Sequence, residues 1–530
     1  MKRKEAEPIF KPYVMNQAAL LPPSYEEIIP ETHLVRIVNE AVEKIDLTPL
    51  VSKYKGGGTS SYHPKMLLKV LIYAYVEKIY SSRRIAKALR ENIHFMWISG
   101  ENRPDFRTLN NFRSSRMKGV IDDVFGAVVE YLMVTGHVKL ENYYVDGTKI
   151  EPNANKHKVV WVKQRNRYHQ KVQEEIKGLL KKIEEENAAE QEEYGDEDLE
   201  ELGGIGNDDV NSEELKRKIN ELNERLRNQS MPKKKMNSIR LKVKKLETKC
   251  MERLEKYEEQ ENILAGRNSY AKTDPDASCM QMKEDRGAKR PWPKPAYNIQ
   301  MGTEKQFIVG YSVHGRVGDT ICLIPLLDKL QKQRKRMPQR IVADAGYGSE
   351  ENYAYLQQHD VENYVKYNTF YQDTRQIRSL AKKRQIQFRA ENFGYDPQKD
   401  EFICPANERL HFLETAPAVA PNGYVANRRN YIAENCQQCE LKKYCTQSET
   451  NRKIQVSFQL MEYRRQAREN LTSELGKELR INRATDVETV FGCIKHNMGV
   501  RRFQLRRLDK VNIEWGLISI AHNMRKMAAK

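Results

Sequence analysis

Apolar residues return every three or four positions in several N-terminal stretches, which is the spacing of helices with one buried face. This pattern predicts helices over residues 34–45 and 83–91, a helix that begins at Pro64, and a short helix capped by Asp105. We therefore predict a helical N-terminal domain over residues 1–135. The glycine-rich run at its centre, KGGGTSS, is expected to form a hinge or loop.

A second pattern, short runs of apolar β-branched and aromatic residues, predicts strands. The predicted strands end at Asp146 or cover residues 296–300, 306–313, 340–344 and 362–367, and helical spacing returns at 320–330 and 350–358. This alternation predicts an α/β fold with a mixed sheet flanked by helices, built from residues 136–156 and 271–370. Residues 302–305 would form the turn of a hairpin, and Asp319 would cap the helix that starts at Thr320.

Residues 157–270 separate the two parts of this α/β pattern with a long insertion rich in Glu, Lys, Gln and Asn. Its sparse apolar residues keep helical spacing, and breaks at 195–209 and 231–235 divide it into about three helices. Each helix is short for a dimeric coiled coil, so we predict a helical arm folded back on itself. A coiled-coil scaffold is an alternative role for the whole chain, but it leaves the flanking α/β motifs unexplained.

Charge adds a possible partner to this outline. The 530 residues carry a formal net charge of +18, which favours contact with phosphate backbones. The short helix after Asp105 carries four candidate DNA-binding residues on one side: Arg107, Asn110, Arg113 and Arg116. Together with the preceding helix it resembles a helix-turn-helix, in which such side chains reach phosphates and base edges. A helical bundle with a solvated basic face would give the same pattern.

Three carboxylates stand in settings that suggest chemistry. Asp146 in YYVDGT and Asp344 in IVADAGY each end a predicted strand, and Glu488 in DVETVFG lies in a helical stretch. Mg²⁺ and Mn²⁺ prefer oxygen ligands, and a pair of such ions can activate the attacking oxygen and stabilise the leaving one at a phosphorus atom. Taken singly, each acid is more often a turn, cap or solvated residue, so only their combination indicates a metal site.

Half of the 8 cysteines lie in the segment 371–470, namely Cys404, Cys436, Cys439 and Cys445. Four thiols that include one Cys-x-x-Cys pair match the ligand set of structural Zn²⁺. An iron-sulfur cluster accepts similar spacing, and unliganded reduced thiols are the remaining alternative. We predict a Cys-containing insertion over these residues, followed by a C-terminal helical part of the catalytic core at 471–530 that contains Glu488.

Several motifs occur together in an order that is typical of one family. They are DFRTLNNFR at 105–113, VDGTKIEPNAN at 145–155, TDPDA at 273–277, AYNIQ at 296–300, ADAGY at 343–347 and VETVFGCIK at 487–495. In these motifs the chain resembles the DDE transposases of bacterial insertion sequences, in the branch with an RNase H-like catalytic domain, a helical N-terminal domain and a Cys-containing insertion before the glutamate. The resemblance extends from about Phe10 to Lys526.

The resemblance implies a function and roles for particular residues. Asp146, Asp344 and Glu488 would be the metal-binding triad of DNA cleavage and strand transfer, with Asp146 bridging two Mg²⁺ or Mn²⁺ ions. Lys495 and Arg483 would contact transposon-end DNA, and a basic run after the glutamate could bind phosphates: Arg501, Arg502, Arg506 and Arg507. The related tyrosine-arginine-glutamate-lysine signature would place its first two residues at Ile481 and Ala484, so the chain departs from it there.

The expected protein is a transposase that binds terminal inverted repeats, with transposon ends and target DNA as partners. A related RNase H-like nuclease or a domesticated DNA-binding protein is the alternative. Because two ends must be held together, we expect a homodimer or a higher assembly on DNA. The N-terminus leads into no apolar signal region and no apolar run of about 18 residues occurs, so a cytoplasmic protein without membrane contact is expected.

Overall fold

The computed structural model describes residues 23–54, 61–194, 209–228, 233–282, 285, 292–374, 379–420 and 423–529. The predicted glycine-rich hinge and the predicted break at 195–209 lie almost entirely outside these residues. Of the predicted break at 231–235, residues 233–235 are described and already belong to a helix, so the prediction is wrong for them. The chain divides into two compact units, one formed by residues 1–117 with 520–530 and the other by residues 118–519. The first unit is therefore shorter than the helical domain predicted over residues 1–135, and it includes the last residues of the predicted C-terminal part.

The described residues of the first unit form helices and no strand. In chain order they are α1 Tyr25–Ile28, α2 Leu34–Lys44, α3 Thr48–Val51, α4 Pro64–Val76, α5 Ser82–Glu91, α6 Ile93–Ile98 and α7 Phe106–Asn111, followed by the π-helical turn η1 Phe112–Arg116. The predicted N-terminal helices are confirmed. Asp105 caps α7, because its side chain accepts a hydrogen bond from the backbone N–H of Thr108. Helix α4 is buried along nearly its whole length and forms the centre of this unit.

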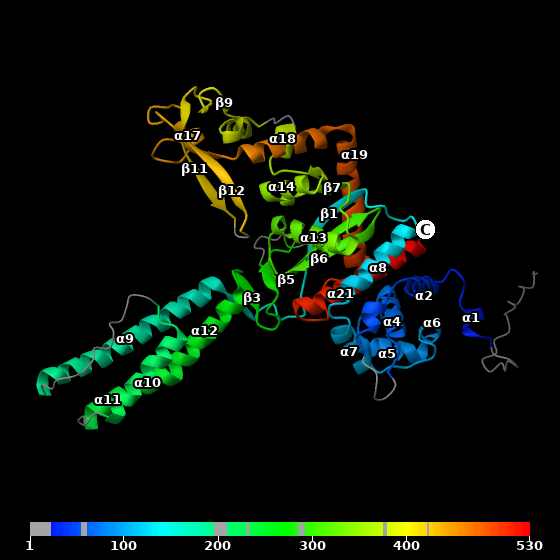
Figure 1. The fold of residues 1–530 in the computed structure, drawn as a ribbon, viewed down its shortest axis with the longest axis horizontal. Helices are drawn as coiled ribbons and strands as arrows, with labels where there is room; N and C mark the ends of the chain where they lie inside the picture. The colour runs from blue at the N-terminus through cyan, green and yellow to red at the C-terminus, as the bar shows by residue number, and fades with distance from the viewer. Residues whose placement is uncertain are drawn as a thin grey trace, which may run out of the picture. The chain divides into compact units, whose positions relative to one another are not determined.

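The second unit is built on a mixed sheet with the strand order β6-β5-β1-β7-β8 (Figure 1). Its strands are β1 Asn142–Ile150, β5 Lys294–Glu304, β6 Phe307–His314, β7 Arg340–Ala343 and β8 Glu362–Val365, with the short β4 Ser278–Met280 paired to β5. Strand β5 runs antiparallel to both of its neighbours, β1 and β6, whereas β7 runs parallel to β1 and β8 runs parallel to β7. The predicted mixed α/β fold is confirmed.

The helices of this unit lie before, between and after the strands of the sheet in the chain. They are α8 Ile121–Val134, α13 Leu323–Arg334, α14 Glu350–Gln358, α15 Phe370–Thr374, α18 Phe458–Thr472, α19 Glu474–Arg483, α20 Thr489–Gly492 and α21 Leu508–Ala528. Helix α8 was predicted to belong to the N-terminal domain, but it packs on α13 and on the sheet. The Tyr311 hydroxyl donates to Asp122 over 2.9 Å, and the rings of Phe125 and Tyr311 pack edge to face. These contacts explain why the boundary falls near residue 117.

Two local predictions in this unit are wrong. The turn of the β5–β6 hairpin lies at Lys305 and Gln306, both with positive φ, because a register shift at Gly302 and Thr303 lets β5 continue to Glu304. Asp319 does not cap a helix through its side chain: a 3₁₀ turn, Thr320–Cys322, follows it, and α13 starts only at Leu323.

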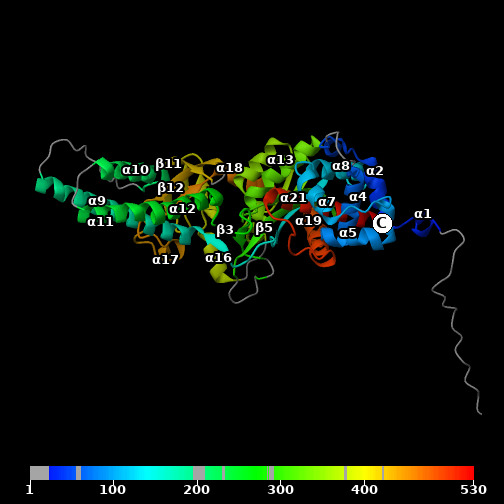
Figure 2. The same ribbon diagram turned by 90° about the horizontal axis from the view of Figure 1, so that it is seen from below.

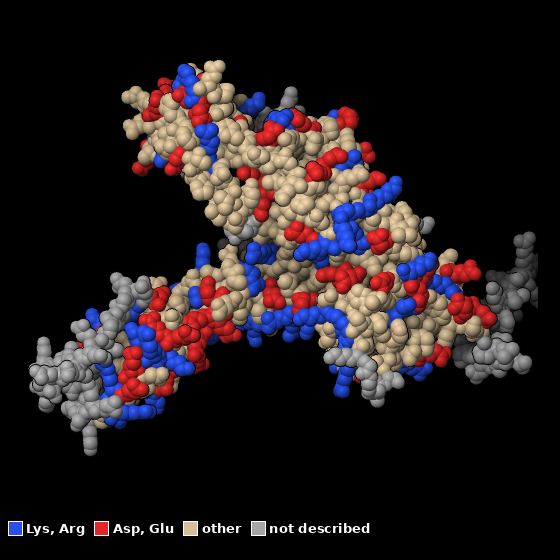
Figure 3. Space-filling model, viewed as in Figure 1, with Lys and Arg blue, Asp and Glu red and all other residues tan. Residues whose placement is uncertain are grey.

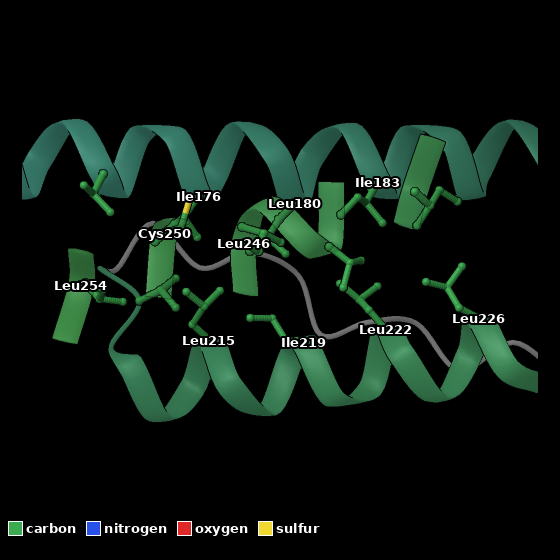
Figure 4. Close-up of a cluster of buried hydrophobic side chains, with 14 residues drawn as sticks. Ile176, Leu180, Ile183, Leu215, Ile219, Leu222, Leu226, Leu246, Cys250 and Leu254 are labelled. Carbon is green, nitrogen blue, oxygen red and sulfur yellow. The ribbon is translucent and has the colours of Figure 1, made fainter. Parts of the chain in front are cut away.

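The insertion forms the predicted helical arm. Its helices are α9 Val162–Tyr194, α10 Ser212–Asn228, α11 Lys233–Lys245 and α12 Met251–Leu264, with the π-helical turn η2 Leu246–Cys250 joining the last two. The helices lie alongside one another in both views (Figure 1, Figure 2). Their predicted apolar stripes meet in one buried cluster that includes Ile176, Ile219 and Leu246 (Figure 4). At the base of the arm, β2 Val159–Trp161 pairs with β3 Ser269–Ala271.

The Cys-containing insertion has a sheet of its own, which the sequence pattern did not predict. Five antiparallel strands are ordered β13-β12-β11-β10-β9, with the bounds β9 Gly394–Asp396, β10 Glu401–Ile403, β11 Arg409–Val419, β12 Val425–Ala433 and β13 Lys453–Val456. The short helices α16 Leu380–Gln387 and α17 Lys442–Cys445 accompany it. Phe402, Leu410 and Tyr431 are fully buried at its centre, so this insertion has a separate small core.

Candidate active site

The two candidate aspartates lie side by side. Strands β1 and β7 are neighbouring parallel strands, and their register pairs Val145 with Ala343. Asp146 and Asp344 follow these paired residues directly. Asp344 comes just after β7, as predicted, but the prediction that the first strand ends at Asp146 is wrong, because β1 continues to Ile150 in its pairing with β5. Parallel pairing thus brings together two acids that are 198 positions apart in the chain.

Asp146 is nearly buried, at 7% exposure. One oxygen, Oδ1, accepts a hydrogen bond of 2.8 Å from the backbone N–H of Gly147. The other oxygen, Oδ2, lies 3.7 Å from Nη1 of Arg483. The backbone N–H group and the guanidinium offset part of the cost of burying this charge.

Arg483 links Asp146 to the candidate glutamate. Its Nη2 donates to Oε1 of Glu488 over 3.0 Å, while its Nη1 faces Asp146. The Arg483 side chain is 11% exposed, whereas that of Glu488 is 53% exposed. The guanidinium therefore stands between two of the three acids, with one inside the site and the other at its rim. The side chain of Arg483 thus faces the acids of the site, and its predicted contact with DNA stays a prediction.

The backbone around Glu488 departs from a regular α-helix. Helix α19 runs into the π-helical turn η7 Ala484–Glu488, then into α20, and a second π-helical turn, η8 Cys493–Asn497, contains Lys495. Wider turns of this kind often occur at functional sites. Because η8 shifts the helical phase, the spacing of seven residues does not by itself put Lys495 on the face of Glu488, and its DNA contact stays a prediction.

A buried carboxylate that the sequence did not single out anchors this helix to the sheet. Asp486 is 8% exposed and accepts hydrogen bonds from the Thr303 hydroxyl and from the backbone N–H of Gln306, which lies in the turn after β5. The helix that carries Glu488 is thus fixed to the hairpin beside β1. No local pattern indicates this contact, because Asp486 lies about 180 residues from Thr303 and Gln306 in the chain.

A polar network lies beside the two aspartates. The hydroxyl of the buried Tyr347 donates to Gln300, whose amide group in turn donates to Asp319 over 3.0 Å. Asn298 also donates to Asp319, over 2.8 Å. Burial raises the pKa of Tyr347 well above its ordinary value, and the nearby charges of Asp146, Asp319 and Asp344 raise it further. Tyr347 is therefore a neutral hydrogen-bond donor, and Asp319 is a fourth acid near the pair.

The basic run after η8 forms a loop with exposed side chains. Arg501, Arg502, Arg506 and Arg507 are all exposed, as the prediction of phosphate contacts requires. Arg502 is also a structural residue, because its guanidinium donates to the backbone carbonyls of Pro152 and Ala154. The loop is thereby joined to the segment that leaves β1 a few residues after Asp146.

The four DNA-binding candidates of the first unit divide into two groups. Arg107, Asn110 and Arg116 are exposed. Arg113 is only 4% exposed, and its guanidinium donates to the Tyr75 hydroxyl, the Tyr80 carbonyl, Ser82 and Asn110. Its predicted role at a DNA surface is wrong, because these buried bonds make it part of the core.

The four cysteines of the insertion line one small pocket. Cys404, Cys436, Cys439 and Cys445 surround a space of about 20 Å³ together with apolar residues such as Leu410 and Leu441. Burial raises the pKa of the Cys445 thiol; Arg452 opposes this shift and the other three thiols add to it. Convergence of all four predicted thiols is what a tetrahedral metal site needs. Throughout the described residues, however, no three His, Cys, Asp or Glu side chains are already arranged to hold a metal ion.

Surface charge and hydrophobicity add two observations. On the face shown in Figure 3, acidic and basic side chains are interspersed along the helical arm, so the arm presents no surface of a single sign there. In the part of the chain that the structure describes, no helix is long and apolar enough to cross a membrane.

Two protein families match the chain. Residues 403–528 match the family described as Transposase DDE domain, and residues 23–115 match the family described as Transposase domain (DUF772). The first match contains Glu488, Lys495 and the basic loop but neither aspartate, and the second contains α7 and η1 up to residue 115. A search of curated proteins and a search of solved structures each found no match.

Proposed function

We propose that this chain, which its two family matches identify as a DDE transposase, binds the terminal inverted repeats of its element, cuts them and joins the freed ends to target DNA. The two family matches support the general activity, which is transposition of a mobile element. The particular steps are our proposal. They rest above all on one observation: Asp146 and Asp344 directly follow the last paired residues of the parallel strands β1 and β7, and Arg483 connects Asp146 to Glu488.

The sheet supports an RNase H-like catalytic core. Three antiparallel strands, β6, β5 and β1, are continued by β7 and β8, which run parallel to β1. In this arrangement the first strand supplies one acid, its parallel neighbour supplies the second, and a helix against the sheet supplies the third. The described strands and the helix that carries Glu488 agree with this plan.

The three carboxylates fit divalent cations by their chemistry. Their oxygens are the ligands that Mg²⁺ and Mn²⁺ prefer, and the guanidinium between Asp146 and Glu488 indicates that positive charge is favoured there. Asp146, Asp344 and Glu488 would hold the ions. Such ions would activate the attacking oxygen and stabilise the leaving oxygen of the phosphodiester.

The chain itself would bind and orient the DNA. Arg501, Arg506 and Arg507 have exposed guanidinium groups beside the segment that follows β1, and we assign them to backbone phosphates near the cut. Lys495 would act in the same region. In the first unit, Arg107, Asn110 and Arg116 would contact the inverted repeat. Two ends must meet for transposition, so we propose a homodimer or a higher assembly on DNA.

For the Cys-containing insertion we propose a structural Zn²⁺ bound by Cys404, Cys436, Cys439 and Cys445. The shared pocket of these thiols supports this role. A bound ion would fix the loop between β12 and β13, where few apolar residues are buried.

End cleavage tests the proposed function. Full-length protein is incubated with labelled duplexes that carry the element ends and with Mg²⁺, and strand cuts are mapped on denaturing gels. Wild-type protein should cut at the element boundary, and Asp344→Asn should bind the ends without cutting them. Glu478→Gln, an exposed change on α19, is the matched control and should cut normally. Cutting that survives Asp344→Asn would refute the assignment of the triad.

A further inference from the structure

The basic loop at 501–507 is held by carboxylates that lie outside it. Its backbone N–H groups point toward Glu514, Asp274 and Asp276, which come from α21 and from the turn between β3 and β4. The side chains of Arg501, Arg506 and Arg507 are exposed. The acids therefore shape the loop while its guanidinium groups remain exposed.

Glu514 makes the largest number of these contacts. It is 2% exposed, and both of its oxygens accept from the backbone N–H of Gln504, over 2.9 and 3.0 Å, while Oε2 also accepts from that of Leu505 over 2.8 Å. A carboxylate that accepts several backbone N–H groups fixes the peptide planes around it. The middle of the loop is thus fastened to the helix that follows it.

The TDPDA turn holds the other end of the loop. Asp274 is fully buried, and its Oδ1 accepts from the backbone N–H of Arg507 over 3.0 Å and from the Tyr297 hydroxyl over 2.9 Å. Asp276 accepts from the backbone N–H of Leu508, the first residue of α21, over 2.8 Å. Two acids from a distant turn therefore cap α21, a role that a residue next to a helix usually has.

The same loop is fixed to the catalytic strand. The backbone N–H of Phe503 donates to the carbonyl of Glu151 over 2.9 Å, and Asn153 donates to the carbonyl of Gln504 over 2.7 Å. Glu151 directly follows the last residue of β1, the strand that carries Asp146. The position of the arginines relative to Asp146 is thus defined by hydrogen bonds on both sides of the loop.

We infer that Asp274, Asp276 and Glu514 are positioning residues for DNA: they hold the loop at 501–507 in one conformation, so that Arg501, Arg506 and Arg507 meet successive phosphates together. This inference rests on the proposed function. An ordered loop loses less conformational freedom on binding than a free one, and this difference increases affinity. The acids thus strengthen the binding of a polyanion although they carry the same sign of charge.

Charge and loop geometry predict opposite effects of these acids on DNA binding, and this difference provides the test. Removing an acid near arginines favours DNA binding by charge alone, whereas releasing the loop weakens it. Asn at position 276 keeps an oxygen acceptor without the charge, and Ala keeps neither. The variants Glu514→Gln and Glu514→Ala make a second pair of the same kind.

Affinity for labelled element ends is measured by fluorescence anisotropy on full-length protein, with EDTA present to prevent cutting. Asp276→Ala should weaken binding about three- to tenfold, as expected for a lost helix cap, while Asp276→Asn should bind at least as tightly as wild type. The Glu514 variants should follow the same order, and circular dichroism checks their folding. If Glu514→Ala does not fold, the half-buried Asp276 pair decides the question.

Two other outcomes would overturn different claims. Equal or tighter binding by Asp276→Ala than by Asp276→Asn would overturn the inference while leaving the proposed function intact. Failure of the wild-type protein to bind element ends would instead overturn the proposed function.

Discussion

Replacement of Arg483 by Met probes how the carboxylates of the site are balanced. The change removes the positive charge 3.7 Å from Oδ2 of Asp146 and 3.0 Å from Oε1 of Glu488, and keeps a side chain of similar length. We expect lower stability without divalent cations, and a larger gain in stability when they are added. The second effect follows because the guanidinium and a bound cation would compete for the same oxygens.

The size of the effect follows from burial. Two unit charges 3.7 Å apart attract by about 4 kcal/mol at an effective dielectric constant of about 20. Asp146 keeps its bond from Gly147, and Glu488 is half exposed, so its pair with Arg483 adds at most about 1 kcal/mol. A buried acid left without its partner is costly, so we expect Arg483→Met to lower the free energy of unfolding by about 2 to 4 kcal/mol.

Urea unfolding followed by circular dichroism measures both effects, with and without MnCl₂. A cation at about 100 times its dissociation constant stabilises the folded state by about 2.7 kcal/mol, so a gain in affinity appears as a larger shift of the midpoint. Lys477→Met, an exposed change on the same helix, should alter stability by less than about 0.5 kcal/mol. An Mn²⁺ shift in Arg483→Met that is no larger than in wild type would refute the competition.

Three further predictions concern other parts of the molecule. Arg113→Met should lower the stability of the N-terminal unit by about 3 kcal/mol, because buried hydrogen-bond acceptors lose a charged donor. Arg116→Met, a change at an exposed residue, should have little effect on stability. Thermal melting compares the two variants. Metal analysis of purified protein should find about one zinc per chain, lost in Cys439→Ser, and an absence of zinc and iron in wild type would end the metal hypothesis. Burial, with Lys329 and Arg316 nearby, lowers the pKa of His314 from 6.5 to about 4. The contribution of the neutral imidazole to stability is therefore complete above pH 6.5 and is lost as the pH falls toward 4. The urea midpoint of the wild type should fall over this pH range, and that of His314→Gln should fall less.

The parts of the site that could be predicted were those with a local signal. Asp146 and Asp344 each end an apolar run, and the presence of a strand at each run could be predicted from a few neighbouring residues, although β1 continues past Asp146 to Ile150. The apolar stripes of the arm were equally clear, because helical spacing repeats over many turns. The four cysteines were found by their type and spacing alone.

The remaining features depend on contacts between distant segments. Nothing near Arg483 or Arg113 in the sequence indicates that these side chains point inward, because an arginine on an amphipathic helix is usually solvated. Asp319 precedes a helical pattern and was predicted to be a cap, but its partners are on β5. The strands β9 to β13 were missed because three of the five have only three or four residues and little alternation.

The central claim is that Asp146, Asp344 and Glu488 form a single metal site although they lie far apart in the sequence. Replacement of Mg²⁺ by Fe²⁺, followed by ascorbate and hydrogen peroxide, cuts the polypeptide next to the bound ion, and mass spectrometry locates the cuts. We predict cuts near all three residues, suppressed by excess Mg²⁺ and absent in Asp146→Asn. Cuts that avoid these three segments, or that persist unchanged in Asp146→Asn, would contradict the account.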